Sequence, residues 1–401
     1  MNYHNRAGYF MKGNGYEFFV PAKLPPDPPI QFDVEMQSLL STADRKLGRL
    51  DGITQTLPNP NMFVAMYVVK EAVLSSQIEG TQASLADVIN AENRQVDNEK
   101  VNDIAETINY VNAMNWGLSE LPKFPLSLRL IRNIHEKLLK NTRGSHRNLG
   151  EFRTSQNWIG PQGCTLKNAT FVPPAVPEMN NALADLELYM HKDDPIPPLV
   201  KIAIIHAQFE TIHPFLDGNG RMGRLLITFW LCQQEILTSP LLYLSYYFKL
   251  HRAEYYDRLM DVRKKGYWEE WIKFFLRGVA ETADESTTTA KEILLLQKQY
   301  SEILNNTDGN NSHYQKLLNR LFETPQIQRT NVVEWLGVTN PTAGNILETF
   351  CRLGILTDMT PEKSRNKKYL FSEYIKILNR GTELKQSNDQ QNTQHDGQNN
   401  A

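Results

Sequence analysis

Apolar side chains recur at intervals of three and four residues through most of this 401-residue chain, which is the spacing of one face of an α-helix. Between about residues 103 and 278 the pattern is helical almost throughout, so we expect a mainly α protein. The predicted helices cover residues 61–79, 103–116, 128–139, 178–191, 199–212 and 252–264, and a closing core helix begins at residue 268.

The pattern is most uniformly apolar on the two sides of residues 213–224, which read HPFLDGNGRMGR. The flanking segments 199–212 and 225–231 are typical of buried helices. Pro214 disfavours helical geometry at His213, so the first of these helices is expected to end there. The intervening residues are therefore predicted to form a turn that leads into the start of a second buried helix.

The second half of this turn has the composition of an anion-binding site. Backbone N–H groups at a helix start are unpaired and lie at the positive end of the helix dipole. Gly218, Gly220 and Gly223 would let the backbone approach a phosphate closely. His213 adds a side chain that can accept a proton near neutral pH. We therefore predict an anion site with a histidine beside it.

Residues 1–60 read as an irregular arm. The proline-rich segment 21–29 cannot form a regular helix or an interior strand, because proline lacks the N–H donor and has a fixed φ. The arm is either a flexible tether or an extended segment that packs on the domain and buries Phe18, Phe19 and Val20.

The helical pattern is interrupted at residues 150–161, where apolar and polar residues alternate as in a short strand. A second short segment, 169–174, could pair with it. A small hairpin of this kind in a helical domain is often only a connection.

Beyond residue 280 the chain becomes more polar. Residues 281–311 predict a linker helix, and residues 312–380 predict a small helix-turn-helix domain with a β-wing. Its predicted recognition helix carries few basic residues, so contact with another protein or with a second copy of the chain, a homodimer, is favoured over DNA binding, which stays an alternative. Residues 381–401, rich in Gln and Asn, predict a disordered tail.

Charge and cysteine content narrow the class of protein. A net charge of −2 provides no general attraction to nucleic acid or membrane. The three cysteines, Cys164, Cys232 and Cys351, are odd in number and far apart, which excludes a fully paired disulfide framework and favours a reducing cytoplasm. None lies in a metal-ligand cluster with histidine, so zinc is not expected. The chain has neither ~18 uninterrupted apolar residues nor a secretory signal, so we expect no membrane partner.

Two strings resemble motifs of one known family. HPFLDGNGRMGR matches the signature of the Fic family, HPFx(D/E)GNGRxxR, at every specified position. SSQIEG, at residues 75–80, resembles the family's inhibitory motif (S/T)xxxE(G/N), here N-terminal to the catalytic motif. The resemblance implies a helical Fic core at 101–280, preceded at 1–100 by an arm and an inhibitory-helix module. It also implies an enzyme that transfers AMP from ATP to protein hydroxyls.

The resemblance assigns roles within the catalytic motif. His213 would be the base that takes the proton from a Ser, Thr or Tyr hydroxyl, and Asp217 would bind Mg²⁺ together with phosphate oxygens and water. Arg224 would bind the γ-phosphate, and Asn219 would add a side-chain donor to the phosphate-binding backbone. The predicted ATP-phosphate residues are Gly218, Asn219, Gly220, Arg221, Met222, Gly223 and Arg224.

Three further groups of residues follow from the same resemblance. The aromatic stripe of 252–264, which alone is typical of a core face, would border the adenine pocket, and the hairpin would be the Fic flap that pairs with the main chain of a target. Ser75, Glu79 and Gly80 would form the inhibitory element, with Glu79 pairing with Arg224. The predicted adenine pocket is Tyr255, Tyr256, Leu259 and Arg263, and the predicted flap residues are Ile159, Gly160 and Pro161.

Alternative interpretations remain at this stage. A Fic-type enzyme can transfer phosphate or phosphocholine, or can remove AMP, and the complete motif favours AMP transfer. The chain could instead be a regulator that binds DNA through the winged helix and only senses ATP. In a purely structural interpretation, Asp217 is a helix cap and the two arginines of the motif are surface charges.

Overall fold

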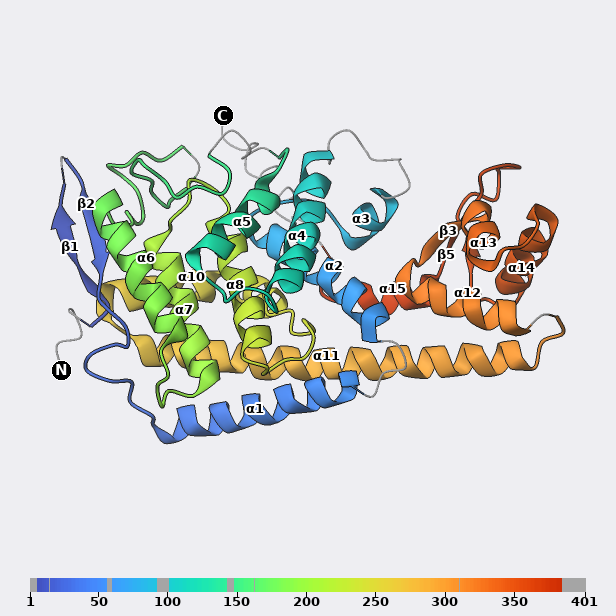
Figure 1. Ribbon diagram of the computed structural model, residues 1–401, viewed down its shortest axis with the longest axis horizontal. Coiled ribbons are helices and arrows are strands. Elements are labelled where there is room, and N and C mark those ends of the chain that lie inside the picture. Colours follow the sequence, from blue (N-terminus) through green and yellow to red (C-terminus); the bar gives the residue numbers. More distant parts are fainter. Residues whose placement is uncertain are drawn as a thin grey trace, which may run out of the picture.

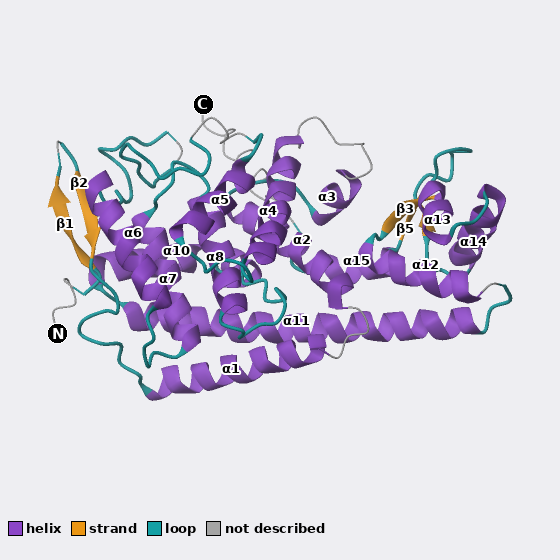
Figure 2. Ribbon diagram, in the orientation of Figure 1, coloured by secondary structure: helices purple, strands orange, loops and turns teal. Residues whose placement is uncertain are grey.

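The computed structural model describes residues 6–13, 15–55, 60–91, 101–142, 148–161, 163–309 and 311–383, and the prediction of a mainly α protein is confirmed (Figures 1 and 2). The helices are α1 (Val34–Gln55), α2 (Pro60–Ile78), α3 (Leu85–Ala91), α4 (Val101–Glu120), α5 (Leu128–Leu139), α6 (Val176–His191), α7 (Pro198–Ile212), α8 (Asn219–Gln233), α9 (Ser245–Leu250), α10 (Arg252–Lys265), α11 (Trp268–Asn305), α12 (Asn311–Glu323), α13 (Arg329–Leu336), α14 (Asn340–Arg352) and α15 (Ser372–Asn379). The strands are β1 (Gly8–Lys12), β2 (Glu17–Pro21), β3 (Gln326–Gln328), β4 (Thr357–Asp358) and β5 (Lys368–Leu370).

Two consecutive helices, α7 and α8, lie at the centre of the larger helical body. Every side chain of α7 after Pro198 is buried, and α8 is buried from Arg221 to Leu231. Helix α7 packs against α6, α8, α10 and α11, and the indole N–H of Trp271 on α11 donates to the carbonyl of Ala203, 2.8 Å away. Because both helices are enclosed, the turn between them is held in one place.

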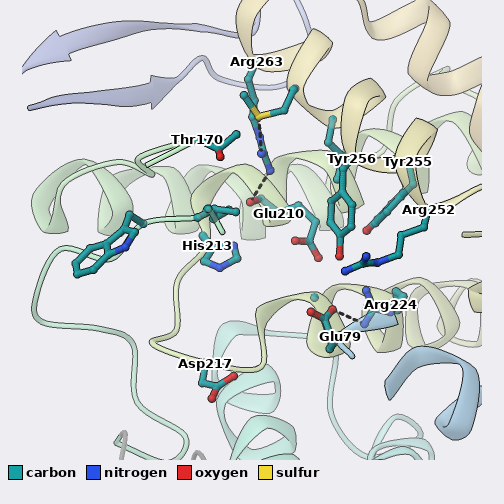
Figure 3. A pocket seen from close by; sticks show the side chains of 16 residues that line it. Glu79, Thr170, Glu210, His213, Asp217, Arg224, Arg252, Tyr255, Tyr256 and Arg263 are labelled. Carbon is teal, nitrogen blue, oxygen red and sulfur yellow. Dashed lines mark hydrogen bonds and ion pairs between the residues drawn. The ribbon is translucent and has the colours of Figure 1, made fainter. Parts of the chain in front are cut away.

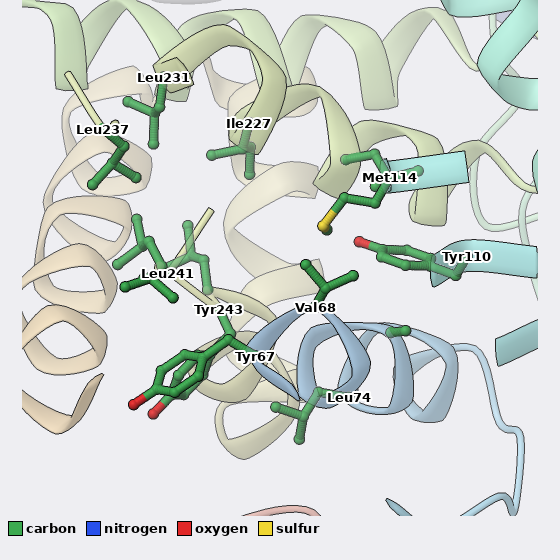
Figure 4. Close-up of a cluster of buried hydrophobic side chains, with 14 of the residues drawn as sticks. Tyr67, Val68, Leu74, Tyr110, Met114, Ile227, Leu231, Leu237, Leu241 and Tyr243 are labelled. Atoms are coloured by element: carbon green, nitrogen blue, oxygen red, sulfur yellow. The ribbon is translucent and has the colours of Figure 1, made fainter. Parts of the chain in front are cut away.

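Helix α2 is part of the same core. Figure 4 shows Val68 of α2 near Tyr110 and Met114 of α4, with Ile227 of α8 above Val68 and Leu74 on the lower side of α2. All five of these side chains are buried. The C-terminal turn of α2 is therefore held next to α8 by apolar packing further along the helix.

The prediction of an irregular arm is wrong for residues 34–55, which form helix α1. Helix α1 runs along α11 (Figure 1) and buries Met36, Leu47 and Leu50 at helical spacing. Its first turn is capped by Asp33, whose carboxylate accepts from the N–H of Met36 at 2.8 Å. Prolines restrict only themselves and the residues directly before them, so the proline-rich segment ends without affecting α1.

The residues before the prolines form the antiparallel hairpin β1–β2. Phe18 and Phe19 are buried, and the N–H of Phe19 donates to the carbonyl of Val172 at 2.9 Å. Of the two predicted alternatives, the extended segment that packs on the domain is confirmed for these residues.

Helix α11 continues without a break through the predicted boundary at residue 280, so residues 281–305 are not a separate linker. Thr282, Ser286, Thr287 and Thr289 are buried. The hydroxyl of Thr287 donates to the carbonyl of Ala283 at 2.7 Å, which satisfies its hydrogen bonding inside the helix. Small hydroxyl residues can thus be buried where sequence polarity predicts solvent exposure.

The C-terminal elements have the order expected for a helix-turn-helix with a wing. Helices α13 and α14 follow each other closely, and β3, β5 and β4 form an antiparallel sheet in that order. Assignment to the winged-helix class stays a prediction. The predicted tail begins later than residue 381, because Thr382 is buried, and residues 384–401 lie outside the described residues. No helix in the described ranges is long and apolar enough to cross a membrane.

Candidate active site

The turn after α7 has the geometry that Pro214 predicts. Helix α7 ends at Ile212, and His213 takes the left-handed conformation with φ of 48°. The carbonyl of His213 accepts from Nε of Arg153 and from Nδ2 of Asn157, each at 3.1 Å. Arg153 and Asn157 therefore orient the histidine from a segment about 60 residues earlier, a role that the sequence analysis missed.

The ring of His213 lines two neighbouring cavities of about 580 and 440 Å³. Within the described residues, its buried Nδ1 atom has no hydrogen-bond partner. Burial lowers the pKa of His213 to about 3, assisted by the positive charges of Arg263 and Arg153. The ring is therefore neutral near pH 7, the state in which one of its two nitrogens has an unprotonated lone pair.

The loop between His213 and α8 is closed by Asn219. Its side chain accepts from the N–H of Phe215 and donates to the carbonyl of Phe215, both at 2.8 Å. One N–H of Nδ2 is used within the loop, and Asn219 also lines the smaller cavity, so the predicted role of this side chain as a phosphate donor stays a prediction. The Asn219 backbone begins α8.

His135, on α5, supports the same loop from the other side. Its ring stacks on Phe215 with centroids 3.7 Å apart, and its Nε2 lies 3.0 Å from the carbonyl of Asp217. The N–H of Gly150 donates to Nδ1, so Nε2 carries the proton and donates to Asp217. This positioning residue was also missed, because its pairing spans 82 residues.

The smaller cavity lies over the first turn of α8 and is lined by Gly218, Gly220 and Arg221. Arg221 forms an ion pair with Glu106 of α4 at 3.1 Å and lies 3.7 Å from Asp217. The backbone amides at the start of α8 and the arginine are suited to phosphate, and the carboxylates of Glu79, Glu106 and Asp217 line the same cavity.

Met222 and Gly223, the other members of the predicted phosphate-binding stretch, face elsewhere. Met222 is fully buried in the core, so its side chain does not line either cavity. A Cβ atom at Gly223 would overlap the carboxylate of Glu210. Met222 thus packs in the core and Gly223 makes room for a neighbour, and a role of these two residues in phosphate binding stays a prediction.

Arg224 is bound by the C-terminal turn of α2. Its Nε donates to the hydroxyl of Ser75 at 2.8 Å, and its Nη2 donates to the carbonyl of Ser75 at 3.0 Å and to Glu79 Oε1 at 2.7 Å. Burial acts to raise the pKa of Glu79, but the guanidinium of Arg224 outweighs it and the pKa lies below its ordinary value. The pairing of Glu79 with Arg224 that the inhibitory motif implies is present.

Two glycines shape this contact. A Cβ atom at Gly220 would overlap Oε1 of Glu79, so the absence of a side chain there lets the carboxylate approach α8. Gly80 ends the helix with φ of 101°, a conformation that favours glycine. Arg252 of α10 adds a contact by donating to the carbonyl of Ile78 at 3.0 Å.

The four residues of the predicted adenine pocket all line the larger cavity (Figure 3). The hydroxyl of Tyr255 lies 2.9 Å from Nε2 of His206, while the ring of Tyr256 is partly exposed. Leu259 is buried, and Arg263 lies over the ring of Phe171 at 4.2 Å. These side chains form an aromatic and apolar wall opposite the flap. Whether it binds adenine stays a prediction.

The predicted flap hairpin is reduced to one pair of residues. Ile159 and Phe171 exchange two backbone hydrogen bonds, of 2.8 and 3.0 Å, and the described part of the segment contains no longer strand. Gly160 lines the larger cavity, and Pro161 accepts from the N–H of Cys164 at 3.0 Å. The hairpin is short because Pro173 and Pro174 follow Phe171 and stop further pairing.

The carboxylate of Asp217 lines both cavities and is about one third exposed. In the described ranges no group of three or more His, Cys, Asp or Glu side chains could hold a metal ion. A cation here would therefore take one hard oxygen ligand from the protein and the rest from phosphate and water. That donor set fits Mg²⁺, which keeps several non-protein ligands, and does not fit structural zinc.

Comparison with known proteins agrees with these motifs. A protein adenylyltransferase Fic of Aedes aegypti is 27% identical over 217 residues, which cover 52% of this chain and 39% of that protein. A protein of the same description from Drosophila grimshawi is 25% identical over 212 residues, covering 52% and 40%. The matched part therefore spans about two fifths of the length of these relatives.

A solved structure shows the same fold. The crystal structure of a Fic family protein from Desulfovibrio desulfuricans G20 superposes with a TM-score of 0.55 at 19% identity, over 86% of this chain and 97% of that chain. In sequence, residues 37–119 match the Fic/DOC family N-terminal domain and residues 125–231 match the Fic/DOC family. With the motif, the turn geometry and the fold in agreement, the chain contains the N-terminal and Fic domains of the Fic/DOC family.

Proposed function

We propose that this protein transfers AMP from ATP to Ser, Thr or Tyr hydroxyls of target proteins, and to hydroxyls of its own chain. The observation that carries the proposal is the neutral ring of His213, which lines both the cavity over the start of α8 and the cavity bordered by Tyr255 and Tyr256. A cavity of about 580 Å³ is large enough for a nucleotide. The descriptions of the relatives, protein adenylyltransferases, support the same reaction.

In the proposed reaction His213 accepts the proton of the target hydroxyl while its oxygen attacks the α-phosphorus of ATP. The bond from the α-phosphorus to the oxygen that bridges to the β-phosphate breaks, and pyrophosphate leaves with the electron pair. The first amides of α8 and the guanidinium of Arg221 stabilise the negative charge that builds on the phosphate oxygens. Asp217 would hold Mg²⁺, which offsets the phosphate charge that repels the attacking oxygen.

The flap would position the target. Ile159 uses its backbone N–H and carbonyl for Phe171, so the neighbouring residues Trp158 and Gly160 direct theirs to the opposite edge. An extended target segment can pair with that edge by strand addition. Trp158 is 42% exposed beside it and offers apolar contact to the target.

In the structure described, Arg224 binds Ser75 and Glu79. If Arg224 is the γ-phosphate ligand, this pairing removes a cation from the triphosphate and also places a carboxylate beside it. ATP would then bind without its α-phosphorus in line for attack. The state described here is accordingly proposed to be the autoinhibited one.

The function is tested by mass spectrometry of the purified Glu79→Gly protein after incubation with ATP and Mg²⁺. We expect modified hydroxyl residues that carry AMP, on this chain and on proteins of a lysate. A gain of phosphate alone would indicate phosphotransfer and would contradict the proposal. His213→Ala in the same background should bind ATP but transfer nothing, and transfer at an unchanged rate would remove His213 from the role of base.

A further inference from the structure

The larger cavity contains one buried carboxylate that the proposed reaction does not use. Glu210 lies on α7 three residues before His213, and its residue is only 6% exposed. The carboxylate lines the cavity; its Oε1 atom is buried against Gly223 without a hydrogen-bond partner in the described residues, so Oε2 is the oxygen that a ligand in the cavity can reach. A buried carboxylate without donors is costly, so its presence at a cavity wall calls for a ligand that supplies them.

The cations nearest to Glu210 bind other groups. Arg263 donates to the backbone carbonyl of Glu210 at 2.9 Å and to the hydroxyl of Thr211, while Arg224 bonds to Ser75 and Glu79. The ring of His206 is also occupied, by the carbonyl of Gly223 and by the hydroxyl of Tyr255. The carboxylate of Glu210 can therefore accept a hydrogen bond from a ligand in the cavity.

The chain also makes room for this side chain. A Cβ atom at Gly223 would overlap Oε1 of Glu210, so any other residue there would displace the carboxylate. Burial raises the pKa of Glu210 to about 7, partly offset by the charge of Arg224 and reinforced by that of Glu79. Hydroxyl donors from a ligand would stabilise the ionised form.

Given the proposed function, the position of Glu210 indicates which part of the bound nucleotide its carboxylate contacts. Figure 3 shows the carboxylate between the ring of His213 and the pair Tyr255 and Tyr256. His213 would face the α-phosphate and the tyrosines the base, and the sugar is bonded to both. A carboxylate repels phosphate, whereas sugar hydroxyls are neutral donors.

We infer that Glu210 is a specificity-determining residue that accepts hydrogen bonds from the ribose hydroxyls of the bound nucleotide. Acidic side chains on ribose hydroxyls recur in nucleotide sites of unrelated folds, for the same reason of complementary donors and acceptors. The inference rests on the proposed function, because it needs ATP in this cavity. Its consequence is that the site discriminates ribonucleotides from deoxyribonucleotides.

The test measures binding rather than transfer. The full chain with Glu79→Gly and His213→Ala, which cannot turn over, is titrated calorimetrically with ATP, 2′-deoxy-ATP and 3′-deoxy-ATP in the presence of Mg²⁺. If the nucleotide lacks a hydroxyl that donates a hydrogen bond to Glu210, binding should weaken about 10- to 100-fold, which is the range for a hydrogen bond to a charged group. Adding Glu210→Ala should weaken ATP binding by a similar factor and remove the difference between the three nucleotides.

Gln208→Ala is the matched control, because Gln208 is a buried polar residue of the same helix that bonds to the carbonyl of Ala22 and does not line the cavity. It should keep the sugar discrimination. If Glu210→Ala does not fold, as judged by thermal unfolding, Glu210→Gln decides the question: it keeps one acceptor oxygen and should reduce the discrimination.

Two results overturn the inference and separate it from the proposed function. The inference would be overturned, and the proposed function would stand, if the variant without the Glu210 carboxylate still discriminated between the sugars. The same holds if that variant changed only the preference for ATP over GTP. Failure of the Glu79→Gly, His213→Ala background to bind any of the nucleotides would overturn the proposed function, and the inference with it.

Discussion

Arg224 has a part both in the proposed activity, as the ligand of the γ-phosphate, and in its proposed inhibition, as the partner of Glu79. Its guanidinium is 2% exposed and donates to three oxygens of α2, two from Ser75 and one from Glu79. Glu79 itself is 36% exposed at the cavity. Glu79 is therefore more easily displaced from this ion pair than Arg224. Removing its side chain should leave the rest of α2 in place.

Replacing Glu79 by glycine should raise AMP transfer by roughly ten- to 100-fold, because a hydrogen bond between charged groups that keeps Arg224 from the nucleotide is lost. Incorporation of radiolabelled AMP into the purified chain measures this. Glu362→Gly, at an exposed position between β4 and β5, is the matched control and should behave as the parent. An unchanged rate in Glu79→Gly would exclude inhibition by this residue.

His213 should remain neutral across the physiological pH range. Since its pKa is lowered to about 3, its ring takes up a proton only in strong acid, in contrast to an exposed imidazole, which does so near pH 6.5. Ring resonances of histidine-labelled protein, assigned with His213→Ala, should stay constant from pH 8 to pH 5 for this residue. A midpoint near 6.5 would show that the ring is solvated.

At the scale of elements, α2 serves two purposes along its length. Val68 and Leu74 are fully buried in the core, while Ser75 and Glu79 face α8. Release of Arg224 therefore requires movement of the last turn only, next to the glycine that ends the helix. Displacement of the whole helix would expose its apolar side chains to water.

Helix α1 and α11 pack along each other, so α1 should contribute directly to the stability of the catalytic body. Leu47→Ala should lower the free energy of unfolding by about 2–5 kcal/mol, since Leu47 is 2% exposed and its loss leaves a cavity. Leu188→Ala, on α6 and 70% exposed, is the matched control and should have little effect. Equal midpoints of denaturant unfolding for the two variants would contradict the packing of α1.

At the scale of the whole molecule, the C-terminal elements contact α2, the helix that precedes Glu79. Helices α12 and α15 pack against α2, and Nε2 of Gln77 donates to the carbonyl of Thr382 at 3.1 Å. Lys249 of α9 donates to the carbonyls of Gly381 and Glu383. Residues 381–383 thus connect the last helix of the chain to the segment that contains Glu79.

A chain that ends after Arg380 should show about a fivefold rise in AMP transfer. It loses the bond from Gln77 to Thr382, and one hydrogen bond of about 1 kcal/mol corresponds to that shift in the population of a displaced α2 end. A chain that ends after Glu383 keeps this contact and should match the full-length protein in the same assay. Equal rates for all three chains would show that the C-terminal contact does not act on α2.

The sequence by itself determined the turn between α7 and α8 and most helices, because each depends on interactions within a few residues. Ser75 and Glu79 were identified only through their resemblance to a family motif, since their contact with Arg224 spans about 150 residues. Apolar spacing places α7 and α8, and Pro214 sets the end of α7 at Ile212. The sequence pattern was misleading in two places. The prolines before α1 led to the prediction of an irregular arm, and the threonines of α11 led to the prediction of a polar linker.

Only the tertiary structure decided which polar groups meet. His135, Arg153 and Glu210 are ordinary members of their segments in sequence, and their roles arise from contacts with residues far along the chain or from a cavity that several helices enclose. Asn219 is part of a local motif, yet only the structure shows that its side chain holds the loop together through two hydrogen bonds to Phe215. Spacing along the chain specifies the face of a helix, whereas the partner on that face depends on the packing of the whole core.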